Sequence, residues 1–79
     1  MSDPSSLDHD RIDQAVLALL LLGQHDGQRV WKGFDWGAME RLHDKGMISD
    51  PRGRAKSVIL TDDGLIEAER LFAVLFTRR

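Results

Sequence analysis

The chain has 79 residues, of which 42% are hydrophobic and 30% charged, with no cysteine and a formal net charge of −2. This length suits one small domain, and the lack of cysteine excludes disulfides, thiol nucleophiles and zinc sites of the CxxC type. A slightly acidic chain is not typical of a dedicated nucleic-acid binder, which carries a basic excess, although a local basic patch stays compatible with it.

The N-terminal stretch, MSDPSSLDHD, is polar and acidic. We predict a flexible tail over residues 1–7 and a single domain over residues 8–79. The start lacks the positive region of a signal peptide, and the longest apolar run, residues 15–22, is far shorter than a membrane-spanning helix. We therefore expect a cytoplasmic protein that does not enter a membrane.

A first helix is predicted from near Asp8 or Asp10 to Leu22, followed by Gly23 at the C′ position. Three aspartates suit its N-terminus as cap or as dipole partners: Asp8, Asp10 and Asp13. Apolar residues at helical spacing predict one inward face: Ile12, Ala15, Val16, Leu19 and Leu20. Additional leucines make every side of the second half of this helix apolar. This pattern indicates that the helix is buried against a second surface as well, such as another subunit.

Three glycines between residues 23 and 35 argue against a helix there, and residues 29–34 are compatible with a short strand. Whether this segment holds a strand or a short helical turn stays open. A second helix is predicted over residues 36–45, with Asp35 as N-cap and Gly46 at C′. Its inward residues are Ala38, Met39 and Leu42. Its outward residues are Glu40, Arg41, Asp44 and Lys45.

A β-hairpin should follow, with Met47 and Ile48 in its first strand and residues 56–61 in its second. The turn SDPRGR places Gly53 where a positive φ is needed. Thr61 is the expected N-cap of a last helix that ends near Phe76. Its apolar stripe comprises Leu65, Ala68, Leu71, Phe72, Leu75 and Phe76.

The stretch MERLHDKGMISDPRGRAKSVILTDDGLIEAERLF resembles the recognition helix, wing and following helix of winged-helix regulators of the multiple-antibiotic-resistance and phenolic-acid types. The matching residues are Leu42, Lys45, Gly46, Met47, Ile48, Leu60, Thr61 and Gly64. This resemblance implies a compact α+β winged-helix-like domain: three helices, a β-hairpin wing and a short third strand where residues 29–34 form one. Residues 23–35 leave little room for the helix that normally precedes the recognition helix. The whole chain also resembles a family of small uncharacterised bacterial proteins, which implies no activity.

Two functions stay open for such a domain, and neither needs a cofactor or a small-molecule substrate. The first is phosphate contact with DNA through cations of the wing, which outnumber Asp50, the acidic residue of the same turn. These wing residues are Arg52, Arg54 and Lys56, with Arg41 and Lys45 on the second helix as secondary contacts. The bland alternative is a solvated hairpin tip, and carboxylates beside the two helix cations disfavour base readout.

The second function is a protein-interaction or dimerisation module that keeps the scaffold without binding DNA. Its candidate contacts are apolar residues of the terminal helices together with one tryptophan: Leu17, Leu21, Trp36, Leu75 and Phe76. The two helices could equally well pack on each other within one chain. A large exposed apolar patch would favour association.

Enzymatic and metal-binding functions have little support. The three His-Asp pairs, at positions 9–10, 25–26 and 43–44, lie in segments that nothing brings together. No HExxH, GxSxG or phosphate-loop spacing is present. We therefore expect no catalytic residue, no metal ligand and no cofactor.

Overall fold

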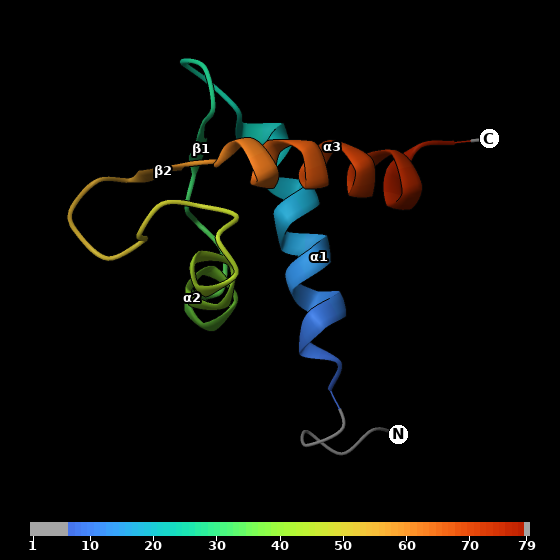
Figure 1. Ribbon diagram of the computed structural model, residues 1–79, viewed down its shortest axis with the longest axis horizontal. Coiled ribbons are helices and arrows are strands. Elements are labelled where there is room, and N and C mark those ends of the chain that lie inside the picture. The colour runs from blue at the N-terminus through green and yellow to red at the C-terminus, as the bar shows by residue number, and fades with distance from the viewer. Residues whose placement is uncertain (1–6, 79) are drawn as a thin grey trace.

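Six short elements follow one another in residues 7–78, the part of the chain that this computed structural model describes (Figure 1). They are α1 (His9–Leu20), the 3-10 helix η2 (Leu21–Gly23), β1 (Arg29–Trp31), α2 (Trp36–Asp44), β2 (Ser57–Ile59) and α3 (Asp62–Phe76). α3 packs across the C-terminal part of α1, and both helices extend past their crossing (Figure 1). The sheet and α2 lie together on one side of α1. The architecture is thus the predicted α+β fold of three helices and an antiparallel pair of strands.

The predicted tail falls mainly on residues 1–6, which, like Arg79, lie outside the described residues. Leu7 has no regular secondary structure, and its side chain is exposed. None of the helices in residues 7–78 combines the length and the apolar character that crossing a bilayer requires.

Side-chain caps begin each of the three α-helices at the predicted residues. The Asp8 carboxylate accepts a hydrogen bond from the Arg11 amide at 3.1 Å. Asp35 accepts one from the Ala38 amide at 3.0 Å, and the Thr61 hydroxyl accepts one from the Gly64 amide at 2.9 Å. Each bond satisfies one of the amides that the first helical turn leaves without a partner.

The helix ends confirm one of the two predicted C′ glycines. Gly46 follows α2 with φ of +76°, a conformation open to glycine at little cost. The prediction for Gly23 was wrong, because α1 tightens into η2 and Gly23 ends that turn without a positive φ. Gly23 is instead a point of close approach: an added Cβ would lie 2.8 Å from Cδ1 of Trp31. Gly53 has the expected positive φ, at +127°.

The predicted hairpin is present in reduced form, because β2 takes β1 as its main partner. The antiparallel register is Arg29↔Ile59, Val30↔Val58 and Trp31↔Ser57. The strand expected at residues 47–48 shrinks to a single bridge between Ile48 and Leu60. Beyond it, the Ile59 amide donates to the Ser49 hydroxyl at 2.9 Å in place of a backbone carbonyl. Pro51 follows and has no amide to extend the pairing.

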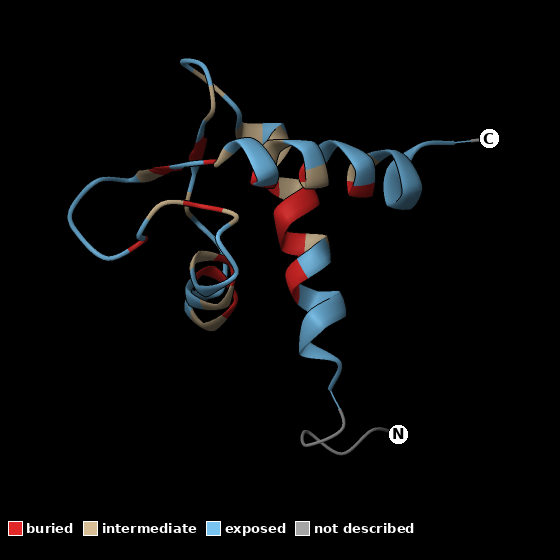
Figure 2. Cartoon of the chain, in the orientation of Figure 1, coloured by how far each residue is buried: buried red, intermediate tan, exposed pale blue. Residues whose placement is uncertain are grey.

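The core lies where α1, α2, α3 and the inner face of the sheet meet (Figure 2). The predicted inward face of α1 was correct at Val16 and Leu20 and wrong at its N-terminal end. Ile12 is exposed, whereas Asp13 and Leu17 are buried. The reason is that α1 contacts both α2 and α3, so its buried surface is set by two neighbours at once. The inward residues predicted for α2, Ala38, Met39 and Leu42, are all buried.

The apolar stripe of α3 is covered along only part of its length (Figure 2). Ala68 and Leu71 are buried, and Phe72 packs against the core. One turn further on, Leu75 and Phe76 remain 47% and 45% exposed. The stripe therefore continues beyond the edge of the core into solvent.

Candidate functional site

A buried carboxylate lies between α1 and α2. Asp13 is only 1% exposed, and Arg41 donates to it through Nε at 2.8 Å and through Nη2 at 2.8 Å. Lys45 donates from Nζ to the same carboxylate at 3.2 Å and to Asp10 at 3.2 Å. Two acids and two bases thus form a neutral cluster that joins the first helix to the second.

The pKa values reflect this mutual neutralisation. Burial alone would raise the pKa of Asp13, but hydrogen bonds from Arg41 and Lys45 outweigh it and hold that pKa below 3.8. The hydrogen bond to Asp13 raises the pKa of Arg41. Burial opposes the same effect on Lys45, whose pKa is raised nevertheless by its bonds to Asp13 and Asp10. Asp13, Arg41 and Lys45 are therefore charged at neutral pH, so the two cations are occupied within the chain.

Sequence reasoning missed this cluster. Asp13 was predicted as a dipole partner near the helix start, yet it takes a position on the buried face that an apolar residue would usually hold. The available signal was spacing: Asp13 precedes the buried Val16 and Leu17 by three and four residues. Arg41 and Lys45 on α2 are also four residues apart, but no sequence pattern could indicate that their side chains would contact Asp13.

The basic loop after Ile48 is also partly neutralised. The Arg52 guanidinium donates two hydrogen bonds to Asp50, at 2.9 and 3.0 Å, and the Arg52 amide donates a third at 2.9 Å, so the pKa of Asp50 is lowered to about 2. Lys32, which follows β1, donates from Nζ to the Pro51 carbonyl at 2.6 Å and holds the loop. Sequence reasoning assigned no role to this lysine.

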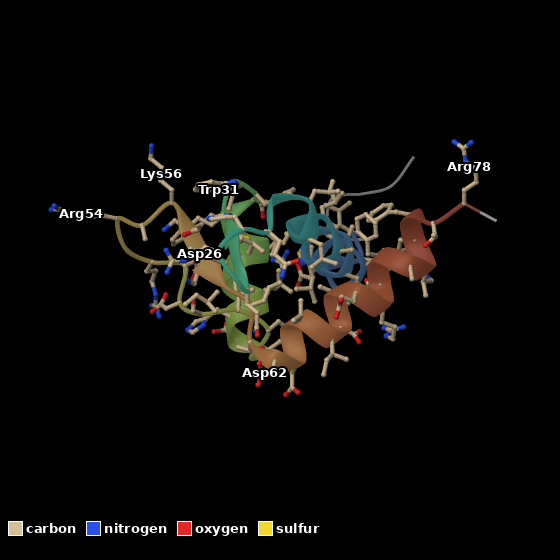
Figure 3. The ribbon with its side chains drawn as sticks, turned by 90° about the horizontal axis from the view of Figure 1, so that it is seen from above. Asp26, Trp31, Arg54, Lys56, Asp62 and Arg78 are labelled. Carbon is tan, nitrogen blue, oxygen red and sulfur yellow. The ribbon has the colours of Figure 1, made fainter. Side chains whose placement is uncertain are left out.

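Two loop cations are left, Arg54 and Lys56. Within residues 7–78 neither forms an ion pair, and Figure 3 shows both side chains directed away from the molecule at one end. Of the five cations predicted to contact DNA, the three others, Arg41, Lys45 and Arg52, are engaged with carboxylates of the chain.

The apolar candidates divide between core and surface. Leu17 is 2% exposed, so the structure corrects its assignment as a surface contact, whereas Leu21 packs against the core and is partly buried. Trp36 is 50% exposed on the first turn of α2. Leu75 and Phe76 are also exposed, and the ring of Phe76 packs edge-on against Phe72 at 5.4 Å between centroids.

A second apolar surface, which sequence reasoning did not find, lies where η2 meets β1. Leu22 and Trp31 are 72% and 53% exposed, and Phe34 lies beside them. Together with Gly23 they line a groove of about 380 Å³. His25 stacks on the Trp31 ring at 4.0 Å between centroids. The expected strand thus buries Val30 and presents Trp31 to solvent.

The LTDDG segment, on which the winged-helix resemblance partly depends, has a structural explanation. Thr61 caps α3 and donates from its hydroxyl to the Gly46 carbonyl at 2.7 Å. Gly64 is buried against the chain after α2, where an added Cβ would lie 1.9 Å from the carbonyl oxygen of Met47. These residues fasten the start of α3 to the end of α2, and this motif needs no DNA to account for it.

The residues that the structure describes hold no assembled metal site, and the hollow beside the buried carboxylate is small. Within residues 7–78, no group of three or more His, Asp or Glu side chains is placed to hold a metal ion. A hollow beside Asp13 has a volume of about 240 Å³, less than the ~300–1,000 Å³ typical of small-molecule sites. The exposed surfaces described above are therefore the more informative features.

Comparison with known proteins places this arrangement in a family. The model of DUF6429, a domain of unknown function, matches residues 8–78. The chain belongs to this family. It is 54% identical over 72 residues to the uncharacterized protein y4hR of Sinorhizobium fredii (strain NBRC 101917 / NGR234). The matched residues cover 91% of this chain and 97% of that protein. No solved structure matches the chain. The predicted resemblance to uncharacterised proteins is confirmed, while no winged-helix family is assigned.

Proposed function

We propose that this protein is a non-enzymatic interaction module that keeps a winged-helix-like scaffold and associates with a second copy of itself. The observation that carries this proposal is the apolar stripe of α3, which continues past the core into solvent. Leu75 and Phe76 follow Leu71 and Phe72 by one turn on the same face, yet remain nearly half exposed. Exposed apolar surface that continues a core is characteristic of association.

A second copy suits this surface because the surface carries no charge. From Leu71 to Thr77 the chain reads LFAVLFT, without an acid or a base. A two-fold interface brings the same patch of both subunits together, so a charged patch would repel itself and an uncharged one does not. Val74, 62% exposed, widens the patch. Charged partners would find nothing complementary here.

The size of the patch sets the expected affinity. A stable interface buries about 800 Å² on each partner, roughly a seventh of the 5616 Å² exposed by this chain. The last two turns of α3 supply only part of that area. We therefore expect a dimer with a dissociation constant in the micromolar range.

Sedimentation velocity from low micromolar to millimolar concentration tests this proposal. The wild-type chain should shift from monomer to dimer, and the double variant Val74→Glu/Phe76→Ser should remain monomeric. Ile66→Glu is the matched control, since Ile66 lies on the same helix and is 66% exposed outside the patch. Because the chain has no cysteine, Val74→Cys and Ile66→Cys can also be compared with a bismaleimide cross-linker. A monomer at every concentration, or a dimer insensitive to the double variant, contradicts the proposal.

DNA contact through the loop is the competing function, and Arg54 and Lys56 are the observation in its favour. Two free cations are few beside the ~6–10 phosphate contacts that give strong binding. Fluorescence anisotropy of a labelled non-specific duplex, at low and then rising salt, separates the two functions. Binding that weakens steeply with salt and is lost in Arg52→Ala/Arg54→Ala/Lys56→Ala would favour a DNA role over the module proposed above.

A further inference from the structure

The groove between η2 and β1 is separate from the end of α3 and has different chemistry. Its lining consists of apolar side chains and glycines, among them Leu19, Leu22, Gly23, Trp31 and Phe34. Leu22 and Trp31 expose more than half of their side chains there. Its volume of about 380 Å³ is enough for one or two bulky side chains and falls within the range of small binding pockets.

Cations lie at one border of this groove. Trp31 pairs with Ser57, and the next amide, that of Lys32, donates to the Lys56 carbonyl at 3.1 Å. Lys56 is therefore one strand away from the groove lining, and Figure 3 places its side chain along the same edge of the molecule as Trp31. Arg54 follows at the end of the molecule. Both are exposed and unpaired within residues 7–78.

The acids nearby do not cancel these two charges. Asp26 lies 3.7 Å from Arg29, and that pair is neutral as a whole. Asp35, beyond Phe34, keeps its negative charge as the cap of α2, and Lys32, which is bonded to the Pro51 and Gly53 carbonyls, keeps a positive charge that balances it. The border of the groove thus has a net positive charge beside an apolar floor.

We propose that this groove binds an acidic segment of a partner protein. A bulky apolar side chain of that segment enters between Leu22, Trp31 and Phe34, and its neighbouring carboxylates meet Lys56 and Arg54. Complementary charge of this kind selects partners and speeds their encounter. The apolar end of α3 from another copy fits this groove less well, because it is followed by Arg78, which the cations would repel.

A single-stranded nucleic acid is the other occupant that cations and an aromatic ring could suit. Such sites stack successive bases on open aromatic faces. Here His25 already covers one face of Trp31, and the rest of the groove is lined by leucines, glycines and the single ring of Phe34. The geometry therefore favours an apolar side chain over a base.

The test starts from a phage-displayed library of random 12-residue peptides selected on the full-length wild-type chain. Peptides that also bind the double variant Leu22→Ser/Lys56→Glu are removed. The survivors should be net negative and carry at least one Leu, Ile, Phe or Trp. Binding of Trp-free survivors is then followed in Trp36→Phe, in which Trp31 is the only tryptophan, by a blue shift of its emission.

Matched variants identify the contacts. We expect Leu22→Ser and Lys56→Glu each to weaken binding of the selected peptides at least about tenfold, because the first removes an apolar contact and the second reverses the charge that the peptide carboxylates face. Ile66→Ser and Arg78→Glu make the same chemical changes away from the groove and should leave binding unchanged. Circular dichroism verifies that all the variants fold.

Three results would overturn the proposal. One is a selection that yields no peptide dependent on the groove, and another is survivors that are basic or lack apolar residues. The third is tight binding of the oligonucleotide dT20 that is lost in Leu22→Ser, which would assign the groove to nucleic acid. Self-association through α3 is measured without peptide, so either proposal can fail while the other stands.

Discussion

Replacing Asp13 by alanine should destabilise the fold, because this carboxylate joins α1 to α2 from a position that is 1% exposed. The variant loses the two hydrogen bonds to Arg41 at 2.8 Å and the bond to Lys45 at 3.2 Å. It also relieves the cost of burying the carboxylate. The sign of the result therefore depends on which of these two effects is larger.

The structure indicates a net loss of moderate size. Breaking a fully buried ion pair costs about 3–5 kcal/mol, much of it from the partner left charged and buried. Here the side chains of Arg41 and Lys45 are 33% and 42% exposed, so water can rehydrate both. We therefore expect Asp13→Ala to lower the free energy of unfolding by about 2 kcal/mol, roughly 8–16 °C in Tm for a domain of this size.

Urea unfolding followed by tryptophan fluorescence measures this loss, with the exposed neighbour Gln14→Ala as control. The double variant Asp13→Ala/Arg41→Ala should be destabilised by less than the sum of the two single variants, because both remove the same interaction. Additive effects would refute the stabilising role of this cluster. So would a loss below ~0.5 kcal/mol for Asp13→Ala, which is the scatter seen at ordinary surface sites.

The same contact predicts a pH dependence. Because the folded pKa of Asp13 lies below 3.8, its contribution to stability is present above the unfolded pKa and is lost as pH falls through the folded value. Asp13→Asn should therefore lose less stability than the wild type between pH 4 and the folded pKa. Equal losses would show that other carboxylates account for acid unfolding.

Two further predictions concern the loop and the start of α3. Asp50 should titrate near pH 2 by NMR, and Arg52→Ala should return its pKa part of the way toward 3.8, since it removes the guanidinium bonds and leaves the amide bond in place; an unchanged pKa would contradict the pairing. Gly64→Ala should cost at least about 3 kcal/mol or prevent folding, because the new Cβ would meet the Met47 carbonyl at 1.9 Å. Gly33→Ala, with nothing within 4 Å, is the control, and equal Tm values would refute the close approach.

Local sequence patterns were sufficient to predict the helices and their starts. Asp8, Asp35 and Thr61 each precede a helix, and a short polar side chain satisfies free amides in its own turn. Gly46 was predictable for the same reason, since a positive φ is a property of one residue. These features depend on neighbours a few residues apart.

Pairings between distant segments were decided by the tertiary structure. β2 pairs with β1 over three residues, whereas residues 47–48 contribute only the bridge between Ile48 and Leu60. The reason is that Pro51 and the loop around it cut the hairpin short. The buried surface of α1 includes Asp13 and Leu17 beside the predicted Val16 and Leu20, because two helices pack on it. Neither result follows from periodicity, since a helix pattern shows that one face is buried without naming what covers it.

The candidate sites show the same division. From sequence, the charges of Arg52, Arg54 and Lys56 predicted a basic loop with Arg41 and Lys45 as secondary contacts, and the apolar terminal helices predicted association. Only the fold brought Asp13 to Arg41, 28 residues away, and set Trp31 against Gly23 to form the groove. Charge and hydropathy are properties of single residues, whereas neutralisation and concavity belong to residues that folding brings together.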